Sequence, residues 1–215
     1  MHCISRLALG LSTTLLALSA AASPLPDAAT VQAAIQQALA ATLLSKDRES
    51  PDAFAEAFAM GRLHSSEVID VPGCLTLPTG ALNCIVVIDY GLGKVANVAL
   101  VLERRGKRWK IQMPPEGSRQ QPEVPAPTLL QVQAIMREEA GRLLAHAHAD
   151  DIDMLRRAAT GYEPHSVNDC ELDERNDPIV YCDVAASLPA TPDAPAFPFT
   201  KRMRFRLQGT DWRHE

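Results

Sequence analysis

Beyond residue 22, the sequence has no uninterrupted apolar run that approaches 18 residues, the length that a membrane-spanning helix needs. It also lacks an excess of basic residues, because 21 Lys and Arg stand against 26 Asp and Glu and give a formal net charge of −5. These absences predict a soluble mature protein that has no transmembrane segment and does not bind nucleic acid.

Several signatures of catalysis and cofactor binding are also missing. No Gly-x-Ser-x-Gly nucleophile elbow occurs anywhere in the chain. The segment Gly91-Leu-Gly-Lys94 lacks the spacing and the following Ser or Thr of a phosphate-binding loop, so we predict a hairpin turn there. The cysteines after residue 22 are too far apart for the close pairs of a four-cysteine zinc site. We therefore expect no catalytic residues, no metal and no cofactor.

Residues 1–22 have the pattern of a cleaved signal peptide. Arg6 lies in a short polar start, the stretch 7–18 is largely apolar, and residues 19–22 are small. Cys3 precedes the apolar stretch, so it cannot be the lipidated cysteine of a lipoprotein. We expect the mature protein to be periplasmic or secreted.

The rest of the chain repeats itself at an offset of about 100 residues. The matching positions are Ile35 with Ile135, Leu43 and Leu44 with Leu143 and Leu144, Gly61 with Gly161, and Gly106-x-x-Trp109 with Gly209-x-x-Trp212. A proline-rich stretch at 114–127 separates the copies and predicts an extended linker. We therefore predict an α+β fold made by tandem duplication, with a first repeat at 23–113 and a second at 128–215.

Each copy carries its own pair of cysteines. Cys74 and Cys84 lie symmetrically about the turn Pro78-Thr79-Gly80, and Cys170 and Cys182 about residues 174–178. A pair centred on a turn suits a bridge between neighbouring antiparallel strands. Export to an oxidising compartment favours disulfides over metal binding, so we predict one disulfide within a hairpin of each unit, Cys74–Cys84 and Cys170–Cys182.

Within each unit the hydrophobic period changes from helical to alternating, which predicts two helices followed by about four antiparallel strands. The expected buried helical positions are Val31, Ile35, Leu39, Leu43, Phe54 and Phe58 in unit one, and Val132, Ile135, Leu143, Leu144, Met154, Leu155 and Ala158 in unit two. Ser50 and Asp150 are the expected N-caps of the second helices, and Gly61 and Gly161 their C-terminal caps.

The alternating segments Leu82–Ile88 and Val180–Ala186 predict central strands, and Trp109 and Trp212 each lie on a last strand after a tight turn. This order of elements and the Gly-x-x-Trp hairpin, as in "GKRWKI", resemble the cystatin-like and NTF2-like superfamily. The resemblance covers the final hairpin and the order of elements, and unit two departs from it because no apolar residue follows Trp212. It implies helices packed on a curved antiparallel sheet, in a superfamily that includes enzymes, inhibitors and binding modules.

The histidines have both a catalytic and a structural interpretation. His146 and His148 lie in an acidic stretch and could converge on a metal only if the preceding helix ends near Ala145. The structural interpretation is a helix end, where the helix dipole favours histidines. His64-Ser65 and His165-Ser166 recur after the capping glycines, which suggests either a hydrolase site or a repeated structural turn. We favour the structural interpretation for both groups.

Two features of unit two differ from unit one and are the candidates for partner binding. The first is a loop inserted at 188–199, stiffened by four prolines and ending in Phe197 and Phe199. The second is an arginine strand, in which Arg202, Arg204 and Arg206 alternate with core residues. The alternatives are that the phenylalanines fold back into the core, and that the arginines form a solvated face or pair with the surplus carboxylates of the chain.

We therefore expect an exported, non-catalytic protein-binding module, such as an inhibitor, an immunity protein or an accessory of an envelope complex. Its partner would be another envelope or secreted protein, and its oligomeric state is not predicted. A small hydrolase or metal-dependent enzyme and a small-ligand carrier are the alternatives.

Overall fold

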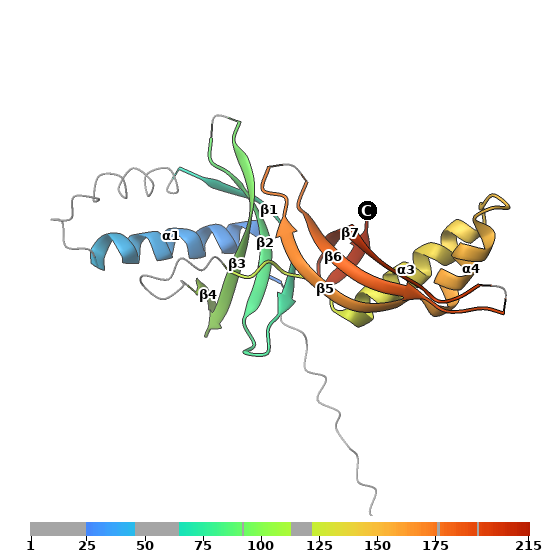
Figure 1. Ribbon diagram of the computed structural model, residues 1–215. Coiled ribbons are helices and arrows are strands. Elements are labelled where there is room, and N and C mark those ends of the chain that lie inside the picture. Colours follow the sequence, from blue (N-terminus) through green and yellow to red (C-terminus); the bar gives the residue numbers. More distant parts are fainter. Residues whose placement is uncertain (1–24, 46–64, 92, 113–121, 176, 193) are drawn as a thin grey trace, which may run out of the picture.

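The computed structural model describes residues 25–45, 65–91, 93–112, 122–175, 177–192 and 194–215. It is an α+β protein with two four-stranded antiparallel sheets, whose strands follow chain order (Figure 1). The first half contains α1 (Ala28–Ser45), β1 (Glu67–Thr76), β2 (Leu82–Asp89), β3 (Val95–Arg105) and β4 (Arg108–Ile111), and the second contains α3 (Leu129–Leu144), α4 (Ile152–Gly161), β5 (Glu163–Leu172), β6 (Ile179–Leu188), β7 (Phe197–Gln208) and β8 (Asp211–His214). We call β1–β4 sheet A and β5–β8 sheet B. The second helix expected in the first half, with Ser50, Phe54, Phe58 and Gly61, lies outside the described residues.

The first half folds around one face of sheet A. Asp27 caps α1, because its carboxylate accepts a hydrogen bond from the Thr30 amide at 2.8 Å. The helix buries its predicted stripe Val31, Ile35 and Leu39 against the alternating side chains of β2. The side chain of Leu43 lies outside the described residues. The helical and alternating periods of the sequence therefore place the core of this half correctly.

The second half has two helices, α3 and α4, on one face of sheet B (Figure 1). A capping box starts α3: the Thr128 side chain accepts from the Gln131 amide, and the Gln131 side chain accepts from the Thr128 amide. Val132 and Tyr162 then pack in a core with the buried side of β6 and β7, which is formed by Val180, Cys182, Val184, Ala186, Met203, Phe205 and Leu207.

Two positions expected in this core are exposed instead. Leu143 retains 42% and Met154 retains 52% of its accessible surface, because these side chains border an open hollow on the helical face of sheet B. Their helical spacing was correct for an inward-facing stripe, but nothing in the described chain covers the end of that stripe.

The ends of α4 also differ from the prediction. Its N-cap is Asp151 rather than Asp150, and the Asp151 side chain makes no capping hydrogen bond. Gly161 is the last helical residue and is not in the left-handed region. Glycine is needed here for space, since a Cβ atom at this position would lie 2.5 Å from Cγ of Pro189.

Both predicted disulfides are confirmed, and each joins neighbouring strands of its own half. Cys74 and Cys84 are direct partners on β1 and β2, with Cα atoms 4.0 Å apart. Cys170 and Cys182 join β5 to β6 at 4.1 Å. Each bridge closes a short hairpin, which by loop-closure arguments stabilises its half by roughly 2–4 kcal/mol.

The predicted hairpins are present, although one loop is shorter than expected. After β2, the Tyr90 amide donates a hydrogen bond to the Lys94 carbonyl at 2.8 Å, which closes the predicted turn. In the second half, Leu188 pairs with Phe197, so the inserted loop spans 189–196 rather than 188–199. The two phenylalanines belong to β7, because pairing with β6 continues to that point.

The face of sheet A away from α1 is a joint with the second half. The Cys74 amide donates to the Gly209 carbonyl, and the Gly209 amide donates to the Pro72 carbonyl, both at 2.8 Å. Gly73 makes this approach possible, since a Cβ atom there would lie 2.6 Å from the Gly209 oxygen. Ile85 on the same face is fully buried in the core cluster of the second half.

A second contact fastens the other side of this joint. The Asn97 amide donates to the Glu174 carbonyl at 3.0 Å, and its side-chain nitrogen donates to the Asp173 carbonyl at 2.7 Å. The chain between the halves also contributes, because Val124 and Ala126 pack on the second core. The two hairpin ends of sheet B therefore rest on the outer face of sheet A, as Figure 1 shows.

Candidate binding site

The arginine strand lies on the outer face of sheet B, and two of its three arginines pair within the protein. Arg202 forms ion pairs with Glu171 and Asp183, and Arg206 with Glu215 and Asp177. These carboxylates raise the pKa of both guanidinium groups. The alternative that the arginines pair with surplus carboxylates therefore describes Arg202 and Arg206.

Arg204 differs from its neighbours on this face. It is exposed, and it forms no ion pair with any described residue. The outer face of sheet B thus presents two exposed cations without an ion pair among the described residues, Arg204 and Arg213 on β8, beside pairs that are already neutralised.

Phe197 and Phe199 lie on the opposite face of the same strand. Phe197 retains 57% of its accessible surface, whereas Phe199 is half-buried against the core. Their rings stack with centroids 6.1 Å apart, and the Phe199 ring lies 6.2 Å from Tyr162. The two candidate features are therefore separated by the thickness of the sheet, and one flat partner surface cannot contact both.

The phenylalanines border an apolar hollow of about 430 Å³ between α3, α4 and β7. Most of its lining consists of methionine, leucine, alanine and aromatic side chains: Met136, Ala140, Leu143, Met154, Leu155, Ala158, Tyr162, Leu188, Phe197, Phe199 and Met203. Its size is typical of sites that hold a small molecule or an inserted side chain. The sequence indicated the phenylalanines, but it assigned Leu143 and Met154 to the core.

The loop beside the hollow is fixed by α4. The Arg157 side chain donates to the Pro189 carbonyl at 2.9 Å and to the Pro195 carbonyl at 2.7 Å. Pro189 also packs against Gly161, where a larger residue would clash. Phe197 therefore follows a loop that is held in place before any partner arrives, which lowers the entropic cost of binding.

Few polar groups line the hollow. The Tyr162 hydroxyl is buried with the Met203 sulfur 3.9 Å away, and this burial raises the pKa of Tyr162 to about 12. Burial therefore favours the neutral hydroxyl of Tyr162 at physiological pH. Glu139 and Lys201 are the charged residues of the lining.

The histidines do not form a catalytic or metal-binding arrangement in the part of the chain that the structure describes. His146 and His148 follow the end of α3 and are exposed, and no group of three or more His, Cys, Asp or Glu among the described residues could hold a metal ion. His165 contacts the Ser187 hydroxyl at 2.9 Å rather than Ser166, and no described carboxylate orients its ring. His64 lies outside the described residues.

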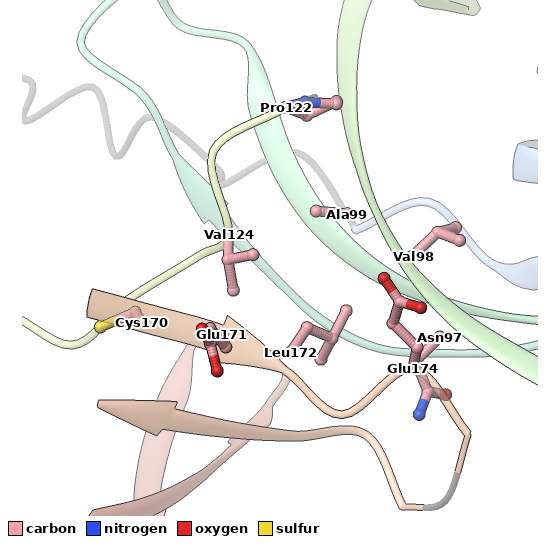
Figure 2. A pocket seen from close by; sticks show the side chains of 9 residues that line it. All are labelled: Asn97, Val98, Ala99, Pro122, Val124, Cys170, Glu171, Leu172 and Glu174. Carbon is pink, nitrogen blue, oxygen red and sulfur yellow. The ribbon is translucent and has the colours of Figure 1, made fainter. Parts of the chain in front are cut away.

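A second hollow, of about 610 Å³, lies between the two halves. Figure 2 shows that its walls come from β3 (Asn97, Val98, Ala99), the linker (Pro122, Val124) and β5 with its turn (Cys170, Glu171, Leu172, Glu174). The Glu171 carboxylate is neutralised by Arg202. This space belongs to the joint, and its lining mixes polar and apolar groups without a converging set of ligands.

No helix among the described residues is both long and apolar enough to cross a membrane. Comparison with known proteins finds no matching family model, no matching curated protein and no matching solved structure.

Proposed function

We propose that this chain is an exported, non-catalytic binding module that captures another envelope or secreted protein through the apolar hollow of its second half. One observation carries the proposal: Phe197, Met154 and Leu143 remain exposed around a hollow with an apolar lining. Large exposed apolar clusters of this kind mark interaction sites in soluble proteins.

The chemistry of the hollow suits a protein partner. Phenylalanine, tyrosine and methionine are enriched at the centres of protein interfaces, where they bury a large area with few rotatable bonds. The Arg157 contacts hold the neighbouring loop, so less conformational freedom is lost when a partner binds. An apolar side chain of the partner would fill the space between α3, α4 and β7.

The proposal also includes the location of the protein and the origin of its two halves. Two disulfides and the absence of a spanning helix among the described residues are compatible with a protein outside the cytoplasm. Residues 1–22 would be the cleaved signal peptide, and the two halves would be copies of one cystatin-like unit. The shared order of four antiparallel strands supports the last point.

Site-specific crosslinking tests the proposal directly. A photoreactive phenylalanine analogue at position 197 should yield a discrete adduct with an envelope protein, and the same analogue at position 204, on the opposite face, should yield none. Phe197→Ser should reduce capture of that partner at least about tenfold, as expected for loss of a buried aromatic anchor.

The control variant replaces Arg202, Arg204 and Arg206 with Glu and should keep the partner. Both variants need to retain the circular dichroism spectrum of the native protein. If the arginine variant loses the partner and Phe197→Ser retains it, the site is the arginine face and the proposal fails.

A small-ligand carrier is the second candidate, and the volume of the hollow favours it. Native mass spectrometry of protein purified from its own host should then show a retained mass that Phe197→Ser releases. Absence of any retained mass would exclude a tightly bound carrier function.

A further inference from the structure

The hollow of the second half carries one uncompensated charge at its edge. Of the two charged residues in its lining, Glu139 is already neutralised by Arg142 on the same helix, with contacts of 2.6 and 3.0 Å. This ion pair also lowers the pKa of the Glu139 carboxyl. The carboxylate of Glu139 is therefore already paired and attracts a cation of a ligand only weakly.

Lys201 is the other charged residue, and it is free. It lies on β7 between Phe199 and Met203, on the same face of the strand, and pairs in register with Val184. Its side chain is exposed, and it has no hydrogen bond or ion pair within the described part of the chain. Because Glu139 in the same lining is paired with Arg142, the charge of Lys201 remains available to a ligand.

The charge of Lys201 also acts on one titratable ring of β8. Half-buried His214 lies nearby, and its pKa is lowered mainly by burial, with Lys201 and Arg204 acting in the same direction while Glu139 and Glu215 act against them. The charge of Lys201 is therefore felt at the edge formed by β7 and β8.

We propose that the partner segment that enters the hollow is an acidic peptide, in which an apolar residue fills the space and a neighbouring Asp or Glu pairs with Lys201. This inference rests on the proposed function and specifies its ligand. A wholly apolar segment would cover Lys201 and remove it from water without a partner, which is unfavourable. A basic segment would place like charges together at the rim of the hollow.

Peptide selection tests this pairing without knowledge of the natural partner. A random heptapeptide library displayed on phage is panned over the native, oxidised protein and over Lys201→Glu, with elution by competition. We expect the native protein to select peptides that place Asp or Glu within three positions of Leu, Phe, Met or Trp. The Lys201→Glu variant should select Lys or Arg at the same places.

Titration of one selected peptide then measures the ion pair. Changing its acidic residue to the amide should weaken binding to the native protein about two- to fivefold, as for an exposed ion pair, and should not change binding to Lys201→Gln. The matched control is Lys94→Gln, an exposed lysine in a hairpin of the first half, which should behave as the native protein.

The outcomes separate the inference from the proposed function. If apolar peptides are selected without acidic residues, or if the amide peptide binds equally well, the role of Lys201 is wrong while the hollow remains a binding site. If Phe197→Ser binds every selected peptide as tightly as the native protein does, both the inference and the proposed function are overturned.

Discussion

The two sheets carry opposite chemistry on the faces away from their helices. In sheet A, Ile85 and Ala99 are register partners at this face, and Ile85 is fully buried against the second half. In sheet B, Asp183 and Arg202 are register partners at the corresponding face and form an ion pair. A sheet covered on both sides has apolar residues on both, whereas a sheet with one wet side alternates.

The outer face is buried in the first half and exposed in the second, so the two halves are under different constraints. The first half uses its outer face and Gly73 to hold the second half, so its sequence is constrained by packing. The second half has a charged outer face, an inserted loop and an open hollow on its helical side. These features support the proposal that the binding site lies in the second half.

The largest loss of stability should come from a substitution on the buried outer face of sheet A. Ile85→Ala removes a fully buried side chain from the joint and should lower the free energy of unfolding by about 2–5 kcal/mol. Asp183→Ala on the other sheet breaks an exposed ion pair and should cost less than about 1 kcal/mol. Urea unfolding of the two variants checks the ratio, and similar losses would show that the outer face of sheet A is not buried in solution.

The disulfides should contribute nearly equally, because they close hairpins of similar length. Replacing Cys74 and Cys84 together by Ala should cost about 2–4 kcal/mol, and replacing Cys170 and Cys182 together should cost a similar amount. Mass spectrometry after non-reducing digestion should first show each bridge within its own half. A link between the halves would contradict the fold itself.

A smaller loss is expected at the point where the two halves meet. Gly73→Ala places a methyl group 2.6 Å from the Gly209 oxygen and the Leu207 side chain and should cost about 1–3 kcal/mol by overpacking. Gly141→Ala in α3 meets nothing within 4 Å and should stabilise by about 0.5–1 kcal/mol, because alanine favours a helix. Thermal unfolding of both variants should therefore shift in opposite directions, and a neutral Gly73→Ala would argue against the close approach.

The smallest effect concerns the inner face of sheet B, where burial lowers the pKa of His214 below 6.5. Its contribution to stability is present above pH 6.5 and is lost as the pH falls through the folded-state pKa. His214→Gln should therefore flatten the decline in stability just below pH 6.5, measured by urea midpoints at several pH values. His148→Gln, which removes an exposed imidazole, is the control, and an unchanged decline in His214→Gln would contradict burial of this ring.

Local patterns in the sequence predicted most of the scaffold. The alternation along β2 and β6, the cysteine pairs centred on turns, and the glycine hairpins before Trp109 and Trp212 are determined by near neighbours. Gly73 carried no such signal, because its role depends on Gly209, more than a hundred residues away. Contacts of this kind are set by the assembled fold and not by any local period.

The candidate site was predicted in part. Phe197 and Phe199 stood out because they follow a proline-rich insertion, and both border the hollow. Leu143 and Met154 have the spacing of core residues. Their exposure depends on the tertiary structure, because no described element covers this end of α3 and α4. Lys201 directly precedes the arginine strand in the sequence, and only the strand register shows that it lies on the face opposite the arginines.

Hydrogen exchange at the amides that cross between the halves tests whether the outer face of sheet A is permanently covered by the second half. We expect the amides of Cys74, Asn97 and Gly209 to exchange as slowly as those of the central strands. Gly106, in the corresponding turn of sheet A and without a partner for its amide among the described residues, should exchange quickly. Fast exchange at Gly209, at the rate of Gly106, would show that the joint opens freely and that the outer face of sheet A is not its permanent partner.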